Sequence, residues 1–115
     1  MLIEKHILNA QRLRRVPLQF SWIDHRLIRC RYLLRAPANA WALYLALVTA
    51  GDEHGLSYYS DGSLGPLLSL SDEQIAAARR QLVAADVVAY ENPLYQVLSL
   101  EGELPGEARR KGATP

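Results

Sequence analysis

The segment from Leu56 to Leu100 constrains the fold of this chain most, because start and stop signals for several short elements follow one another there. Leu56–Tyr59 is a short apolar run bounded by polar turns, which predicts a strand. Ser71 and Gln74 form the S-x-x-Q capping box that marks the start of a helix. A strand and a well-capped helix are therefore expected close together in the sequence.

A shorter helix is expected between them. Either Ser60 or Ser63 can cap it. A cap at Ser60 would place Pro66 in the helix interior, where its ring clashes with the carbonyl group four residues earlier at a cost of about 3 kcal/mol. A cap at Ser63 keeps Pro66 in the first turn, where no hydrogen-bond donor is lost. We therefore expect this helix to begin after Ser63 and to end near Leu68.

The helix that Ser71 caps is expected to end near Ala85-Asp86 and to be followed by a hairpin. Its apolar residues recur at helical spacing and form an inward stripe of Ile75, Ala78, Leu82 and Ala85. Val87–Tyr90 and Leu94–Leu100 are apolar runs separated by Glu91-Asn92-Pro93. This pattern predicts two antiparallel strands joined by a tight turn.

The N-terminal part of the chain is also expected to contain helices. Residues 1–15 carry an apolar stripe at helical spacing, and Pro17 ends the pattern because the residue before a proline resists the helical conformation. Ser21, with Asp24 three residues later, predicts the cap of a second, short helix over about residues 21–29.

Asn39 opens a further helix that Gly51 ends, and this helix is apolar nearly all round, which predicts a buried central position. The expected fold class is mainly α with a small antiparallel β-wing, in the element order of a winged helix-turn-helix with extra N-terminal helices. The expected organisation is a basic helical extension over 1–35, the winged-helix domain over 36–100, and a disordered tail over 101–115 that is rich in Gly, Pro and charge.

The stretch Ala40–Tyr90 resembles the winged helix-turn-helix at the front of phage and plasmid replication initiators and primosome-type proteins. The residues that carry the resemblance are Asp52 and Gly55, Ser60 and Leu64, Leu68, Ser71, Arg80 and Leu82. The segment QFSWIDHRLIR also resembles the lead-in of small winged-helix proteins carried near transposable elements. The chain departs from the family pattern at Gly65-Pro66, where the family has an alanine and a polar residue, and in its wing, which has no Lys or Arg.

Charge is distributed unevenly along the chain. Residues 1–36 carry eight basic and two acidic residues, a balance of +6, whereas residues 37–78 carry five acidic and no basic residues, a balance of −5. Residues 79–115 balance at zero. Seven of the eight N-terminal basic residues are arginines, which favours a phosphate-bearing partner because guanidinium binds phosphate bidentately. The alternative is a solvated helix face that pairs with the acidic middle of the same chain.

In a winged helix the helix that follows Ser71 would lie in the major groove of DNA. There Arg80 could address guanine and Gln81 adenine, while the alanines of the same face allow close approach. An arm containing Arg12–Arg15 could follow the backbone or enter a minor groove. Asp72 and Glu73, at the start of the helix, oppose phosphate. The candidate DNA-contacting residues are Arg12, Arg14, Arg15, Arg26, Arg29, Arg31, Ala76, Ala77, Arg79, Arg80 and Gln81.

The sequence predicts no catalytic residues, no metal site and no cofactor. Asp24-His25 and the acidic pair before His54 lack metal-ligand spacing, Cys30 has no evident activating base, and Tyr58-Tyr59 read best as strand residues. The longest apolar run, Ala40–Ala50, is too short to span a bilayer, which needs roughly 20 residues. With no signal-peptide pattern and a single cysteine, we expect a cytoplasmic protein with no membrane partner.

The expected function is non-enzymatic binding of double-stranded DNA, as a regulator or accessory factor in replication or transposition. The alternative is a protein–protein interaction module on the same fold, because the outer face of the helix after Ser71 is acidic and alanine-rich. A homodimer formed through a helix over Leu2–Leu13 is a separate expectation.

Overall fold

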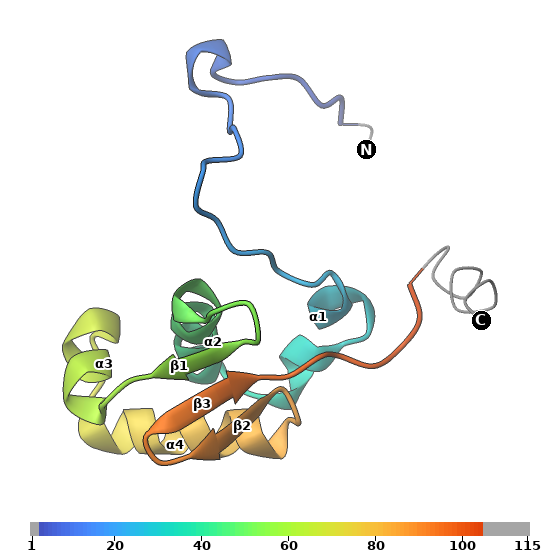
Figure 1. The fold of residues 1–115 in the computed structure, drawn as a ribbon. Coiled ribbons are helices and arrows are strands. Elements are labelled where there is room, and N and C mark those ends of the chain that lie inside the picture. The colour runs from blue at the N-terminus through green and yellow to red at the C-terminus, as the bar shows by residue number, and fades with distance from the viewer. Residues whose placement is uncertain (1–2, 105–115) are drawn as a thin grey trace.

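A computed structural model describes residues 3–104 of the chain. Its elements are the short 3₁₀ turns η1 (Ala10–Arg12) and η2 (Tyr32–Arg35), the helices α1 (Arg26–Arg29), α2 (Ala38–Ala50), α3 (Asp61–Leu68) and α4 (Asp72–Ala84), and the strands β1 (Leu56–Tyr58), β2 (Val88–Glu91) and β3 (Leu94–Val97). Figure 1 shows α2, α3 and α4 gathered around the sheet, with the N-terminal segment extending away from them. The expectation of a helix-rich fold with a small antiparallel sheet is confirmed.

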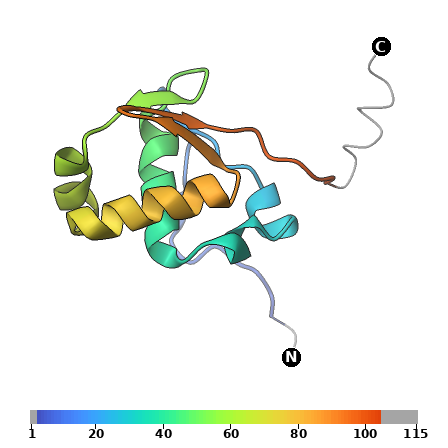
Figure 2. The ribbon, with the colours of Figure 1, turned by 90° about the horizontal axis from the view of Figure 1, so that it is seen from below.

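The three strands form an antiparallel sheet in the order β1-β3-β2. Tyr95 of the central strand is opposite Ser57 on one side and Tyr90 on the other. Below the sheet, α4 crosses α2 (Figure 2). The buried apolar side chains of both helices and of the sheet form one core that includes Leu43, Leu47 and Tyr95. The inward stripe Ile75, Ala78, Leu82 and Ala85 is buried as expected.

The capping box at the start of α4 is confirmed. The hydroxyl group of Ser71 accepts a hydrogen bond from the Gln74 amide at 3.1 Å, and the Gln74 side chain accepts one from the Ser71 amide at 2.9 Å. Two otherwise unpaired amide groups are satisfied reciprocally, so local sequence alone sets where α4 begins.

The helix expected over residues 1–15 is wrong. The described part of this segment contains only η1, where Asn9 accepts a hydrogen bond from the Gln11 amide. Residues 3–23 are exposed throughout, so the apolar stripe that suggested a helix has no surface to pack against in one copy of the chain. An isolated helix of this length is marginal in water without such packing, which accounts for the failure.

The cap expected at Ser21 is also wrong. Helix α1 begins at Arg26, and the Asp24 carboxylate accepts a hydrogen bond from the Arg26 amide at 2.8 Å. His25 is the N-cap residue and makes no side-chain cap bond, so Asp24, expected only as the partner of Ser21 in a capping box, instead supports the turn that leads into α1.

Helix α3 begins after Ser60 rather than after Ser63, which corrects the expected cap. Ser60 accepts a hydrogen bond from the Ser63 amide at 3.1 Å, and Pro66 lies inside the helix. The only intrahelical bond that Pro66 removes is to the carbonyl of Gly62, and both residues are exposed, so water can satisfy that carbonyl. The helix ends at Leu68, as expected.

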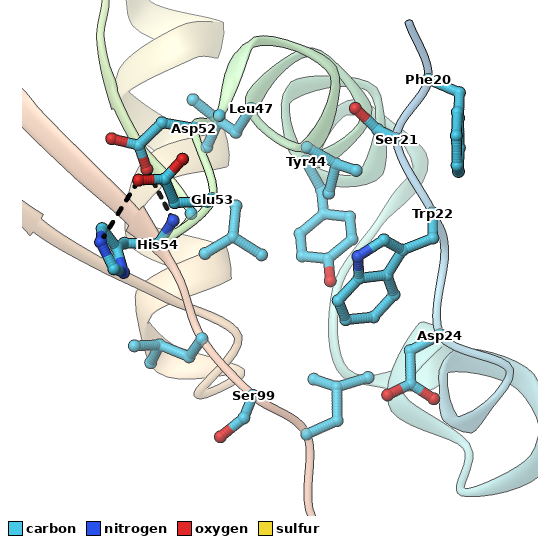
Figure 3. Close-up of a pocket in the computed structure, with 16 residues that line it drawn as sticks. Phe20, Ser21, Trp22, Asp24, Tyr44, Leu47, Asp52, Glu53, His54 and Ser99 are labelled. Carbon is cyan, nitrogen blue, oxygen red and sulfur yellow. Dashed lines mark hydrogen bonds and ion pairs between the residues drawn. The ribbon is translucent and has the colours of Figure 1, made fainter. Parts of the chain in front are cut away.

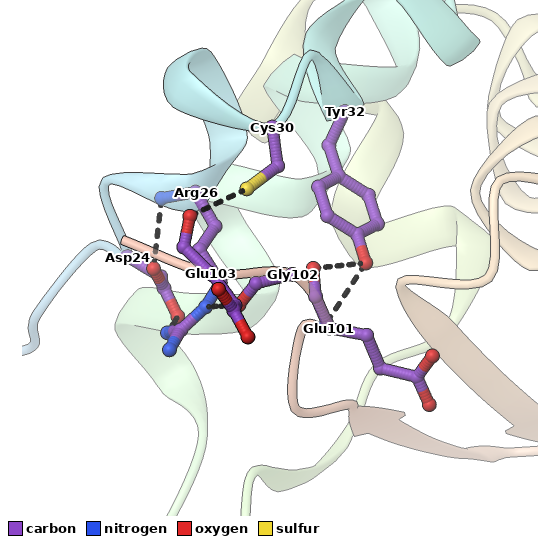
Figure 4. Close-up of polar contacts among 7 residues, drawn as sticks. All are labelled: Asp24, Arg26, Cys30, Tyr32, Glu101, Gly102 and Glu103. Atoms are coloured by element: carbon purple, nitrogen blue, oxygen red, sulfur yellow. Dashed lines mark hydrogen bonds and ion pairs between the residues drawn. The ribbon is translucent and has the colours of Figure 1, made fainter. Parts of the chain in front are cut away.

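The expected tail over 101–115 falls mostly outside the described residues, which end at residue 104. Residues 101–103 are held against α1 and η2 (Figure 4). The Glu101 amide donates to the Tyr32 hydroxyl at 2.8 Å, and that hydroxyl donates to the Glu101 carbonyl at 3.0 Å. The Arg26 guanidinium donates to the Gly102 carbonyl at 2.9 Å. The start of this segment is therefore part of the folded body.

Leu27 and Tyr32 belong to the same buried core as α2, so the folded body reaches back into residues 1–35. Residues 36–100 therefore share their core with the segment that precedes them. Over the span that the structure describes, no helix is long and apolar enough to cross a membrane.

The connection between α3 and α4 depends on a close approach at Gly65. A Cβ atom on Gly65 would lie 2.9 Å from the carbonyl oxygen of Leu70, whereas one on Gly62 would meet only the Ser60 hydroxyl at 3.9 Å. Gly65→Ala is therefore expected to lower the free energy of unfolding by about 1–3 kcal/mol through overpacking. Gly62→Ala, the matched control, should raise it by about 0.5–1 kcal/mol because alanine favours the helix. Urea denaturation measures both, and equal effects at the two positions would contradict this account.

The turn between α2 and β1 depends on the Asp52 carboxylate, which accepts hydrogen bonds from the amides of Leu56 and His54 at 2.9 and 2.8 Å. These bonds lower the pKa of Asp52 below its ordinary value. A depressed pKa stabilises the folded state above the unfolded-state pKa, and this contribution is lost as the pH falls through the folded-state value. We therefore expect Asp52→Asn to reduce stability at neutral pH, and the difference from the native chain to shrink as the pH falls below 3.8. Thermal unfolding over this pH range checks it; a pH-independent difference would contradict it.

Candidate nucleic-acid interface

Helix α4 presents one open face to solvent, seen in the foreground of Figure 2. Arg80 on this face is exposed, whereas Ala76, Ala77 and Gln81 are half-buried. Arg80 is therefore the residue of this predicted set best placed to reach a partner, and the alanines beside it leave room for a close approach.

Arg79, which precedes Arg80 on α4, makes its polar contacts within the protein. Its guanidinium group donates to the Asp61 carboxylate at 2.7 and 3.3 Å and to the Tyr95 hydroxyl at 3.0 Å. It also lies over the Tyr90 ring, 4.7 Å from the ring centroid. The hydrogen bond to Asp61 holds the pKa of Arg79 above its ordinary value. Arg79 therefore connects α4 to the start of α3 and to both hairpin strands, and we leave it out of the candidate interface.

Arg26 is likewise committed to the folded body. Its guanidinium forms an ion pair with Asp24 at 2.9 Å, in addition to its bond to Gly102 (Figure 4). Arg35 is also engaged within the protein. Its guanidinium donates to the Ala85 carbonyl at 3.0 Å and lies over the Tyr32 ring. Both side chains hold the segment around α1 and η2 to the rest of the molecule.

The other predicted arginines are exposed: Arg12, Arg14, Arg15, Arg29 and Arg31. Within residues 3–104, these five and Arg80 have no hydrogen-bond or ion-pair partner. Six guanidinium groups are therefore available to a partner.

The structure divides these six groups between two places. Figures 1 and 2 show that the arm with Arg12, Arg14 and Arg15 extends on the side of the molecule away from α4. Arg31 immediately precedes η2, which Arg35 ties to the C-terminal end of α4. Arg31 is therefore connected, through η2 and Arg35, to the C-terminal end of α4.

Carboxylates lie at both ends of α4 and at the hairpin. Asp72 and Glu73 are exposed at its N-terminal end, Asp86 is exposed just after its C-terminal end and Glu91 at the hairpin turn, and residues 36–100 carry two basic residues against seven acidic ones. Carboxylates at a helix N-terminus are favourable through the helix dipole, but they repel phosphate. Any anionic partner of α4 is therefore expected on the face around the exposed Arg80, between the carboxylates at the two ends of the helix.

The residues considered for chemistry do not form a reactive constellation. The imidazole of His54 lies 3.7 Å from the Glu53 carboxylate, with both side chains largely exposed, and the Cys30 sulfur lies 3.9 Å from the Glu103 carbonyl oxygen. Among the residues the structure describes, no three His, Cys, Asp or Glu side chains are grouped so that they could hold a metal ion.

A cavity of about 460 Å³ was not anticipated from the sequence. It lies between the end of the arm, α2, the turn that follows α2, and the end of β3, and Figure 3 shows Trp22 and Tyr44 side by side in it. The Tyr44 side chain is largely buried, and its hydroxyl, which has no hydrogen-bond partner within residues 3–104, is open to solvent in the cavity. Burial, and then the nearby Asp24 carboxylate, raise the pKa of Tyr44. Residues far apart in sequence make this cavity, so no local pattern could have revealed it.

Comparisons of the chain with family models, curated proteins and solved structures found no match. Function is therefore inferred from the fold, the charges and the geometry of the chain itself.

Arg79 and Arg80 offer a matched pair of substitutions. Arg79→Lys should lower the free energy of unfolding by about 1–2 kcal/mol, because lysine cannot reproduce the paired bonds to Asp61 together with the bond to Tyr95. Arg80→Lys, at an exposed neighbouring position, should change it by less than about 0.5 kcal/mol. Urea denaturation measures both. If Arg80→Lys lowered the free energy of unfolding as much as Arg79→Lys, the structural role given to Arg79 would be contradicted.

Proposed function

We propose that this chain is a winged helix-turn-helix protein that binds double-stranded DNA without catalysis, as a cytoplasmic regulator or accessory factor in replication or transposition. The observation that carries the proposal is the placement of α4. This capped helix follows α3 through a tight turn, leaves one face open to solvent, and lies beside the β2–β3 hairpin. A helix presented in this way is suited to the major groove.

The charges favour one end of α4 for this contact. Arg80 is exposed in its C-terminal half, and Arg29 and Arg31 lie in the segment tied to that end. In the proposed complex, Arg80 approaches a base edge or phosphate, and Arg29 and Arg31 contact the neighbouring backbone. The carboxylates of Asp72 and Glu73 then lie away from the nearest phosphates.

Fluorescence anisotropy with a labelled random duplex, from about 50 to 200 mM salt, tests the proposal. We expect non-specific dissociation constants of roughly 10⁻⁴–10⁻⁶ M at physiological salt, weakening steeply as salt rises. Arg80→Ala and Arg31→Ala should each weaken binding and reduce the salt slope by about 1, since each removes one phosphate contact. Glu73→Gln should strengthen binding because it removes a repelling charge.

Gln96→Ala, at an exposed position of β3, is the control and should leave binding unchanged. Absence of binding at the lowest salt concentration would overturn the proposal. Binding that is lost only when Arg12, Arg14 and Arg15 are replaced together by alanine would keep DNA as the partner and move the contact from α4 to the arm.

A protein–protein interaction module is the second candidate, favoured by the excess of carboxylates around α4 and the hairpin. Such a surface suits a basic protein partner better than phosphate. Glu73→Lys at the start of α4 should then disrupt capture of that partner, whereas any DNA binding should become stronger, because the substitution replaces a charge that attracts a basic protein and repels phosphate. Capture that survives this substitution would remove α4 from the protein interface.

A further inference from the structure

The N-terminal arm, residues 3–23, exposes far more apolar surface than a chain in water normally leaves open. Its large apolar side chains are each at least 48 % exposed: Ile3, Ile7, Leu8, Leu13, Val16, Leu18, Phe20, Trp22 and Ile23. Over residues 3–19 the hydrogen bonds are local to the arm, as between Asn9 and Gln11. An exposed apolar segment of this size marks an interaction surface.

The folded body carries an uncovered apolar groove between α1, η2 and α2. Its apolar lining includes Ile28, Leu33, Trp41 and Leu45. Leu45 is 54 % exposed although it lies on the central helix, which was expected to be buried all round. Ile23, at the end of the arm, also lines this groove, and Phe20 and Trp22 line the cavity of Figure 3, so the part of the arm that is free of its own body is residues 3–19. Residues 3–19 and the groove are therefore two apolar surfaces of one chain that are both left uncovered.

This groove continues into the cavity of Figure 3, because Asp24 and Tyr44 line both. At the far side of the cavity are the carboxylates of Asp52 and Glu53. Tyr44 lies at the boundary between the two parts, with its ring largely buried and its hydroxyl open to solvent. We call the groove and the cavity together the trough. Its chemistry is apolar at one end and acidic with polar acceptors at the other.

We propose that the trough binds the N-terminal arm of a second copy of this chain, so that two copies exchange their arms about a twofold axis. The arm has the chemistry that the trough would recognise. Its apolar residues alternate with basic ones, as in Leu13-Arg14-Arg15-Val16, and residues 3–23 carry four basic residues against Glu4 alone, a balance of +3. Apolar side chains fill the groove while guanidinium groups approach Asp52 and Glu53, within a body whose residues 36–100 balance at −5.

Reach and size favour a second copy as the source of the arm. The arm runs away from the folded body (Figure 1), and its last residues, Phe20, Trp22 and Ile23, line the trough. Fully extended, residues 3–19 would reach about 56 Å, which is long enough to reach the trough of an adjacent copy. Residues 3–19 number 17, slightly fewer than the roughly 20–30 residues on one side of a standard interface. Exchange about a twofold axis covers both arms and both troughs, so neither apolar surface stays exposed to water.

Size-exclusion chromatography with light scattering on the full chain tests the proposal. The native chain should have twice the 12.9 kDa mass of one copy. An arm variant, Ile7→Ser with Leu8→Ser and Leu13→Ser, should be monomeric, and so should a trough variant, Ile28→Gln with Leu45→Gln. Mixing the two should restore a dimer, because one supplies an intact trough and the other an intact arm. Leu67→Gln, an exposed leucine on α3, is the control and should remain dimeric.

A second measurement needs no variant. A synthetic peptide of residues 3–20, in excess, should convert the native dimer into monomers that each carry one peptide. A native chain that is monomeric at all concentrations, a dimer that survives the arm or trough substitutions, or a dimer that the peptide leaves intact would each overturn the proposal. None of these measurements uses DNA, so their failure would leave the proposed DNA binding untouched, and the reverse also holds.

Discussion

The arrangement of this fold depends on the guanidinium group of Arg79. It joins Asp61 at the start of α3, Tyr95 in the central strand and Tyr90 in the neighbouring strand, so one side chain fixes α4 relative to two other parts of the molecule. The apolar stripe of α4 sets which face of the helix is buried. Because apolar packing is not directional, the polar contacts of Arg79 supply the directional constraint between α4 and the hairpin.

A consequence is that the fold uses arginines in two different ways. Arg26, Arg35 and Arg79 stabilise the body by closing contacts between segments far apart in sequence, whereas Arg80 and the arginines of the arm stay exposed. The basic character of the N-terminal third is thus partly structural and partly available to a partner. Since the body itself is acidic, an anionic partner of α4 can approach only a limited part of its surface, and a basic segment has a larger area open to it.

The capping box, the inward stripe of α4 and the hairpin could be predicted because each depends on residues close together in sequence. The prediction of a helix over residues 1–15 was wrong. An apolar stripe indicates that these side chains need a surface to pack against, but it does not show that the same copy of the chain supplies that surface. The predicted cap of α3 was wrong because the clash expected of Pro66 inside a helix was taken as decisive, whereas α3 accommodates Pro66 two residues before its end and leaves Gly62 exposed to water.

The sequence by itself determined the helix-rich class with a small antiparallel sheet, the start of α4 and its buried face, since local hydrogen bonds and periodicity specify them. Only the tertiary structure decided which arginines are free, that residues 101–103 pack against Tyr32 and Arg26, and that Tyr44 lies where an apolar groove meets an acidic cavity. These features are contacts between residues that lie tens of positions apart in the chain. Their formation depends on how the elements pack, and no local pattern of residues encodes that packing.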